Sequence, residues 1–250
     1  MGLTTKMLDL HISLNKTSVN KLLAIFPHPD DESFCTAGLF QLAQKNDIKT
    51  TLICLTKGER GTNSLGVGNL KKIRTKELEL AAEVLGIDEL LNWDFPDLNL
   101  KDTKKIWSEK LKRKIDKLNP DIIVTFDHSG ITGHPDHIVV STEVLHILKE
   151  MKKPPSLLWR IPDEQEKAFF RENSSLIFAS KPTHILKYGF SETLNKIKAI
   201  YTHASQMKSF RFKIQILEWF LFDHKELYCK VDLNKKYTHK FVLKKQRLII

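Results

Sequence analysis

The chain has few of the features that mark secreted, disulfide-bonded or membrane-spanning proteins. It holds 3 cysteines in 250 residues, and none of them form a Cys-x-x-Cys pair. This argues against a disulfide framework and against a cysteine-type structural zinc site. We therefore expect Cys35, Cys54 and Cys229 to be small buried side chains. No apolar run reaches 18 residues, so no transmembrane helix is expected.

The N-terminal segment also lacks targeting signals. Polar residues occur throughout its first twenty positions, where a signal peptide needs an apolar block. The chain begins with Met-Gly, but Lys6 stands where a myristoylation site needs Ser or Thr. These absences predict a cytoplasmic protein.

Acidic residues are scarcer than basic ones. The formal net charge is +10, and the last fifty residues hold eleven Lys and Arg but four acids. A solvated basic face is the simplest interpretation. The alternatives are attraction to an anionic substrate, an acidic membrane surface or nucleic acid.

Short apolar runs alternate with amphipathic stretches along the chain. We expect strands at 22–26, 50–56, 89–95, 121–126, 156–161 and within 183–190. Helical patterns cover 33–45, 78–85, 107–118, 134–150 and 191–206, and loops are expected at 57–69 and 127–133. This alternation predicts an α/β, Rossmann-like fold: a mostly parallel sheet with helices on both faces.

No repeat, low-complexity tract or linker divides the chain. A single domain over residues 1–250 is therefore expected. The stretch just beyond Met207 is ambiguous, because its apolar residues at 210–221 fit a strand pattern and a helical pattern.

Two clusters of acids and histidines follow predicted strands. PHPDDE at 27–32 directly follows the strand at 22–26, and GHPDH at 133–137 lies one loop after the strand at 121–126. Sites in open α/β sheets form outside the carboxyl ends of the strands. The two clusters would therefore face each other if these strands are neighbours.

The adjacent acids Asp30, Asp31 and Glu32 need a counter-charge, because burying them beside an apolar strand would otherwise be costly. A divalent cation supplies that charge. Two histidines and one carboxylate, with one position left open, are typical of a catalytic zinc site. The expected ligands are His28, Asp31 and His137. Zinc is the default, but the set also suits Fe2+, and another divalent metal is left open.

This ligand set leaves Asp30 and His134 beside the metal. A free carboxylate there can take a proton from an attacking water. A free histidine can stabilise a developing oxyanion or protonate a leaving nitrogen. Either motif alone is weak, since helix starts are commonly acidic. The two together, each after a strand, are a stronger indication.

The segments AIFPHPDDESF and TFDHSGITGHPDH resemble the PIG-L/LmbE-like de-N-acetylases. These are zinc-dependent enzymes that remove the acetyl group from N-acetylglucosamine attached to another group. TKGERGT, IRTKELELAAEVLGI, WDFPDLNL and KAIYTHASQ also resemble stretches of this family. The resemblance covers residues 20–206 and leaves 207–250 as a basic C-terminal extension.

The resemblance implies the same three metal ligands, with Asp30 as general base and His134 as the electrostatic and acid partner. It further implies that Arg74 and Asp97 contact the sugar or the group attached to it. The alternatives are a surface arginine on a helix for Arg74 and a turn acid for Asp97. His203 fits a helix end as well as it fits a site.

The predicted activity is metal-dependent hydrolysis of the N-acetyl group of an N-acetylglucosamine-type conjugate, which releases acetate and a free amine. The expected partner is this amino-sugar conjugate. No nucleic acid is expected, and peripheral contact with an anionic membrane is left open. The sequence does not specify the group on the sugar or the oligomeric state.

The sequence also admits two rival functions. A non-catalytic basic module could bind lipid or nucleic acid and retain a metal site, but a structural site has no need of the extra carboxylate of Asp30. An iron(II) oxygenase would usually be built on a β-sandwich, which the alternation of strands and helices disfavours.

Overall fold

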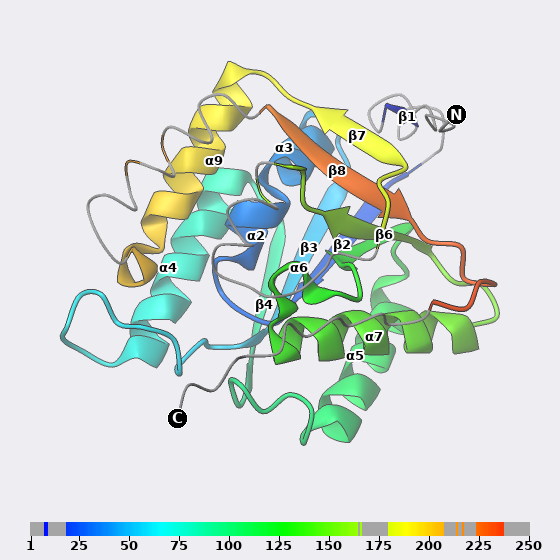
Figure 1. Ribbon diagram of the computed structural model, residues 1–250, viewed down its shortest axis with the longest axis horizontal. Helices are drawn as coiled ribbons and strands as arrows, with labels where there is room; N and C mark the ends of the chain where they lie inside the picture. Colours follow the sequence, from blue (N-terminus) through cyan, green and yellow to red (C-terminus); the bar gives the residue numbers. More distant parts are fainter. Residues whose placement is uncertain are drawn as a thin grey trace, which may run out of the picture.

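The described part of the molecule is built around one β-sheet (Figure 1). The computed structural model describes residues 8–9, 19–164, 166, 180–207, 214, 217 and 224–237. Within them eight strands lie in the order β1-β7-β8-β6-β5-β2-β3-β4. Their bounds are Leu8–Asp9 (β1), Lys21–Phe26 (β2), Lys49–Thr56 (β3), Glu89–Phe95 (β4), Ile122–Phe126 (β5), Ser156–Ile161 (β6), His184–Lys187 (β7) and Lys225–Lys230 (β8).

The sheet is mostly parallel, as predicted. Strand β2 pairs in parallel with β3 on one side and with β5 on the other. The strand order therefore runs outward in both directions from the β2–β5 boundary, which makes this boundary a topological switch point where α/β sheets bind ligands. The two motif-bearing strands are neighbours.

Strand β8 interrupts the parallel arrangement. It lies between β6 and β7 and pairs antiparallel with both. Because β8 falls within 207–250, the stretch assigned to a basic extension contributes a strand to the interior of the sheet. The predicted patterns at 210–221 lie outside the described residues, except for helical positions 214 and 217. The single-domain organisation stays a prediction.

Helices cover both faces of the sheet (Figure 1). One face carries Asp31–Cys35 (α2), Ala37–Lys45 (α3), Leu70–Leu85 (α4) and Phe190–Thr202 (α9), and the other carries Lys104–Leu118 (α5) and Pro135–Glu150 (α7). Leu22 and Ala24 belong to the first core, whereas Leu23 and Ile25 belong to the second. A strand buried on both faces reads as a continuous apolar run, which explains the sequence of β2. The predicted fold class is confirmed.

One predicted helix boundary is found where expected, and one predicted helix is divided in two. Helix α4 ends at Gly86, which adopts the left-handed conformation with φ 68°. The predicted helix at 33–45 is two helices, because Thr36, with φ −138° and ψ 16°, leaves the helical conformation.

Two other predictions need correction. The loop predicted at 127–133 contains the short helix Gly130–Gly133 (α6). Helix α9 does not extend to residue 206, since a separate 3-10 turn, Ala204–Gln206 (η1), follows it. The N-cap of α9 is Gly189, whose N–H donates to the Glu192 carboxylate at 2.8 Å.

The prediction that the cysteines are small buried side chains is confirmed. All three cysteines are free and buried. In the part of the chain that the structure describes, we find no helix with both the length and the apolar character needed to cross a membrane.

Candidate active site

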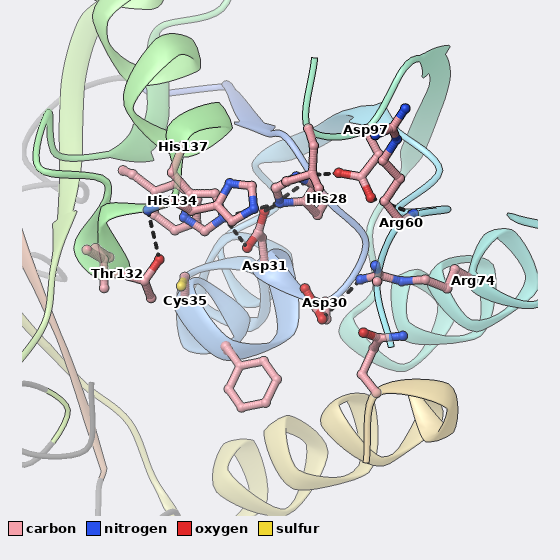
Figure 2. Close-up of a pocket in the computed structure, with 16 residues that line it drawn as sticks. His28, Asp30, Asp31, Cys35, Arg60, Arg74, Asp97, Thr132, His134 and His137 are labelled. Carbon is pink, nitrogen blue, oxygen red and sulfur yellow. Dashed lines mark hydrogen bonds and ion pairs between the residues drawn. The ribbon is translucent and has the colours of Figure 1, made fainter. Parts of the chain in front are cut away.

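A cavity of about 320 Å³ opens at the carboxyl ends of β2 and β5 (Figure 2). Every site residue expected from the sequence lines it: His28, Asp30, Asp31, Arg74, Asp97, His134 and His137. The turn after β2 and the start of α2 supply the PHPDDE side chains, and the start of α7 supplies the HPDH histidines.

Three of these side chains converge. His28 Nδ1 lies 3.2 Å from His137 Nε2. The two oxygens of Asp31 lie 3.8 Å from His28 Nδ1 and 3.5 Å from His137 Nε2. All three residues are less than a tenth exposed. His28 and Asp31 are three positions apart, whereas His137 lies 109 and 106 positions further along the chain, yet all three side chains surround one small volume.

Hydrogen bonds on the far edge of each ring fix the tautomers. His28 Nε2 lies 3.1 Å from Asp97 Oδ1 and 3.3 Å from Asp136 Oδ2, so this nitrogen carries the hydrogen. His137 Nδ1 lies 3.1 Å from the Gly130 carbonyl oxygen and must carry its hydrogen for the same reason. Each ring, when neutral, has a lone pair on the nitrogen that faces the other ring, as metal-binding histidines do. Burial alone would lower the pKa of His28, but its hydrogen bonds with Asp136 and Asp97 raise it to about 10, so a bound cation would displace the proton from His28 Nδ1.

The separations fit a divalent cation. Nitrogen ligands at about 2.0–2.1 Å from a tetrahedral zinc ion lie about 3.3 Å from each other. The observed separation of 3.2 Å between the two ring nitrogens agrees with this. Burial raises the pKa of Asp31, so without a cation this carboxylate resists ionisation. The donor set thus fits the predicted metal.

The ring of His134 is hydrogen-bonded differently from the rings of His28 and His137. Its ligand atom lies within 4.8 Å of those of His28 and His137. However, its Nδ1 accepts the Asp136 N–H at 3.2 Å as the cap of α7, which leaves the hydrogen on Nε2. Burial and the neighbouring His28 charge lower the pKa of His134 to about 4. A neutral imidazole with an Nε2–H suits a hydrogen-bond donor to a substrate oxygen.

Asp30 lies beside the ligand cluster and is held by Arg74 (Figure 2). Arg74 Nη2 lies 3.1 Å from Asp30 Oδ2, and Nη1 donates to the Gly58 carbonyl oxygen at 2.9 Å. Burial raises the pKa of Asp30, although the Arg74 charge opposes this. Arg74 is 4% exposed, so the alternative of a surface arginine is wrong. Its contact with a sugar stays a prediction.

Asp97 joins the metal-facing ring to the long loop after β3. One oxygen lies 3.1 Å from His28 Nε2, and the other accepts the Arg60 N–H at 2.9 Å. Burial alone would raise the pKa of Asp97, but the hydrogen bond from His28 lowers it to about 2. The carboxylate therefore orients a ring, and its predicted contact with the substrate stays a prediction.

The family whose model is described as "PIG-L: GlcNAc-PI de-N-acetylase" matches residues 23–148, half of the chain and both motifs. The chain belongs to the PIG-L family. The family resemblance seen in the two motifs is thereby confirmed.

Relatives of this PIG-L chain extend the match beyond the motifs. It is 30% identical over 200 residues to a probable N-acetyl-alpha-D-glucosaminyl L-malate deacetylase 2 of Bacillus anthracis, covering 74% of this chain and 80% of that protein. It is 31% identical over 141 residues to a probable N-acetylglucosaminyl-phosphatidylinositol de-N-acetylase of Schizosaccharomyces pombe, covering 54% of each.

A solved structure supports the fold of this PIG-L chain. The N,N'-diacetylchitobiose deacetylase of Pyrococcus horikoshii superposes with a TM-score of 0.66 at 20% identity, over 86% of this chain and 84% of that one. At this identity the likeness concerns the fold.

Two residues in the PIG-L motifs, Asp136 and Glu32, make contacts that the motif spacing does not predict. Asp136, between the two histidines of HPDH, accepts the Leu98 N–H at 2.8 Å besides facing His28. Glu32, at the end of PHPDDE, accepts the Asp30 N–H at 3.0 Å. Their place inside the motifs was the available signal, but neither partner is evident from spacing.

His203 is neither a surface residue nor a pocket-lining one in this PIG-L chain. It is fully buried at the end of α9, and its Nε2 lies 2.8 Å from Glu32 Oε1. Burial alone would lower the pKa of His203, but the Glu32 carboxylate raises it. The two side chains form a buried ion pair behind the cavity.

Proposed function

We propose that the protein is a zinc-dependent hydrolase that removes an N-acetyl group from an N-acetylglucosamine-type conjugate and releases acetate and a free amine. One observation carries this proposal: His28 Nδ1 and His137 Nε2 lie 3.2 Å apart beside the Asp31 carboxylate. Membership of a deacetylase family supports the reaction class.

The three residues His28, Asp31 and His137 would hold the ion. Zinc suits a tetrahedral site of two nitrogens and one carboxylate, and Fe2+ is the nearest competitor for these ligands. A bound dication supplies Lewis acidity, which lowers the pKa of water and polarises an amide carbonyl.

The chain's own groups would then manage the proton and the developing charge. Asp30, fixed by Arg74 at 3.1 Å, takes a proton from the attacking water. The Nε2–H of His134 donates to the amide oxygen as it becomes negative. The proton held by Asp30 passes to the leaving nitrogen, so that one water and one amide give acetate and an amine. The neutral form of His134 supports the electrostatic part of its predicted role.

The mouth of the cavity suits an anionic group on the sugar. Arg60 lines the cavity and is exposed, and its side chain has no acidic partner among the described residues. A carboxylate-bearing conjugate, as in the name of the Bacillus anthracis relative, would bring a negative charge to this arginine. A cytoplasmic location and contact with an anionic membrane stay predictions.

The rival function is that of a non-catalytic basic module, which binds lipid or nucleic acid and retains a metal site. The partly buried carboxylate of Asp30 beside the proposed ligands speaks against it, because a structural metal site has no use for a further unliganded acid.

A conjugate screen tests the proposal. N-Acetylglucosamine carrying malate, inositol phosphate or a second N-acetylglucosamine is incubated with the purified protein, and free amine is measured. Amine release should stop after metal removal by a chelator and return on addition of zinc. Release from the anionic conjugates should exceed release from the neutral one. Binding without amine release would favour the rival module, and release that persists in verified metal-free protein would contradict the metal assignment.

A further inference from the structure

Asp30 has an unusual backbone for a residue with a side chain. Its φ is 101° and its ψ is −28°, at the position that precedes α2. Residues other than glycine adopt such positive φ values at a cost in free energy, and they keep them only where their surroundings impose them. What imposes this conformation also determines where the Asp30 carboxylate points.

The peptide group that joins Pro29 to Asp30 is held at both of its polar atoms. Arg74 Nη2 donates a hydrogen bond to the Pro29 carbonyl oxygen. The Asp30 N–H donates to Glu32 Oε2 at 3.0 Å. The plane of this peptide is thereby fixed from two sides, by one cation and one anion.

Glu32 is itself fixed by a residue from the other end of the chain. Its second oxygen accepts a hydrogen bond from Ser33 Oγ at 2.6 Å and lies 2.8 Å from His203 Nε2. Glu32 is 1% exposed and His203 is 0% exposed. His203 Nδ1 has no partner among the described residues, so its ring is held through the Nε2 edge. Neither Glu32 nor His203 lines the cavity.

We propose that the buried Glu32–His203 pair is a positioning pair, which holds the Asp30 peptide in its left-handed conformation and so aims the Asp30 carboxylate at the reacting water. This inference rests on the proposed function, in which Asp30 is the base. His203 acts through Glu32, and Glu32 acts through the Asp30 N–H, so neither residue touches the substrate.

The simpler explanation is that the pair only fastens α9 to α2. The contact of Glu32 Oε2 argues against it, because one whole oxygen of the carboxylate bonds to the Asp30 peptide while the other bonds to His203. If Glu32 only joined α2 to α9, its contact with His203 would be sufficient.

Substitution of Glu32 separates the two explanations. Glu32→Ala should lower kcat by about 100-fold, because small displacements of a catalytic group have effects of this size. KM and zinc affinity should stay near those of the wild type. Glu32→Gln should recover much of the rate, since an amide can accept from the Asp30 N–H and donate to a neutral His203. His203→Ala should lower kcat by on the order of 10-fold, because it removes the outer member of the pair.

Glu192→Gln is the matched control. Glu192 is also a buried carboxylate that accepts a backbone N–H and contacts a cation, Lys45, but at the opposite end of α9. A 13-residue helix separates the two ends by about 20 Å. This variant should lose some stability and keep the wild-type kcat.

A double-mutant cycle gives the decisive comparison. If Glu32 acts through the base, Glu32→Ala should have no further effect on kcat in an Asp30→Ala background. An additional loss there, or a parallel loss of zinc affinity, would overturn the proposal, as would a folded Glu32→Ala protein with normal kcat. If Glu32→Ala does not fold, His203→Ala is carried through the same cycle.

A spectroscopic readout keeps this test distinct from that of the proposed function. The Asp30 amide proton, bonded to a carboxylate, should resonate downfield in the wild type and move upfield in Glu32→Ala but not in Glu192→Gln. If no conjugate released amine, the proposed function would be contradicted, but the chemical shift of the Asp30 amide proton could still be compared between the variants. An Asp30 amide shift that is unchanged in Glu32→Ala would contradict the positioning role of the Glu32–His203 pair and leave the proposed function untouched.

Discussion

At the scale of single residues, the site depends on which nitrogen of each ring is free. When neutral, His28 and His137 have their lone pairs on the nitrogens that face each other, because their other nitrogens are hydrogen-bonded. His134 instead has its hydrogen on Nε2, because its Nδ1 caps α7. Three histidines from two short motifs would therefore divide into the two proposed ligands and one proposed donor. Hydrogen bonds of the main chain and of buried acids make this division.

Replacing Asp30 should separate catalysis from metal binding. We expect Asp30→Asn to lower kcat by about 10²–10⁴-fold, the usual contribution of a positioned base, and to keep its zinc. Asp31→Asn should lose the metal as well. Zinc content by atomic spectroscopy and amine release by the same protein preparation give the comparison.

The control for these substitutions is Asp94→Asn, because Asp94 is an exposed acid that pairs with Lys71 at 2.6 Å. It should change neither zinc content nor rate. Near-normal turnover in Asp30→Asn would rule out the base assignment.

Replacing Asp97 should distinguish its two roles. If the carboxylate orients His28, Asp97→Ala should weaken zinc binding by about 10–100-fold, as is usual for partners of metal-bound histidines. Asp97→Asn, which keeps an acceptor for the ring N–H, should bind zinc more tightly than Asp97→Ala. Competition with a chromophoric chelator measures both. A raised KM with unchanged zinc affinity would instead favour the substrate contact implied by the family resemblance.

At the scale of elements, helix α9 illustrates how a local charge supports a helix start. Glu192 accepts the Gly189 N–H and pairs with Lys45. The hydrogen bond from Lys45 is the main reason that the pKa of Glu192 lies below its usual value of 4.5. Because the folded protein favours the ionised form, this contribution is present above about pH 4.5 and is lost as the pH falls through the lowered pKa.

A comparison of thermal unfolding tests this pH dependence. At pH 7 Glu192→Gln should melt about 1–3 °C below the wild type, because a pair whose lysine is largely exposed contributes less than about 1 kcal/mol. Below the lowered pKa the two proteins should melt together. A difference that persists undiminished at pH 3 would show that the charge is not responsible.

The elements that the sequence predicted well are those with a strong local pattern. Strand β2 is an unbroken apolar run, and Gly86 ends α4 with a positive φ. The break at Thr36 was missed, because it is a change in the backbone conformation of one residue, which hydrophobic periodicity does not mark.

The site was predictable to the extent that its chemistry is local. His28 and Asp31 are three positions apart, and so are His134 and His137, which made both motifs visible. Partners that come from distant segments left no such trace: His203 meets Glu32 across 171 positions. A single sequence carries residue types but not the long-range pairing that gives buried acids their neighbours.

At the scale of the whole molecule, β8 ties the end of the described chain to its interior. Glu226 on this strand is fully buried and accepts the N–H groups of Gly38 and Leu39 at the start of α3. It also lies 3.6 Å from the buried Lys196 Nζ. Removing one partner of such a buried pair commonly costs about 3–5 kcal/mol, so β8 contributes to stability as well as to the sheet.

Truncation should therefore abolish folding. A chain that ends at Met207 loses β8, which exposes the edges of β6 and β7, and we expect aggregation or no cooperative thermal transition. The control replaces the exposed Lys230, Lys235 and Lys236 by serine, which removes basic charge and keeps the strand. This variant should melt nearly as the wild type does. A soluble, cooperatively melting truncated protein would show that residues 208–250 are dispensable.

The position of β8 also sets an order of events during synthesis. The ribosome makes β6 and β7 before the strand that belongs between them, so a nascent chain holds two unpaired edges until residue 230 emerges. The proposed ligands are complete far earlier, by residue 137. A growing polypeptide thus has the means to capture its ion while translation continues, and that capture would favour the native pairing of β2 with β5 before the last strand arrives.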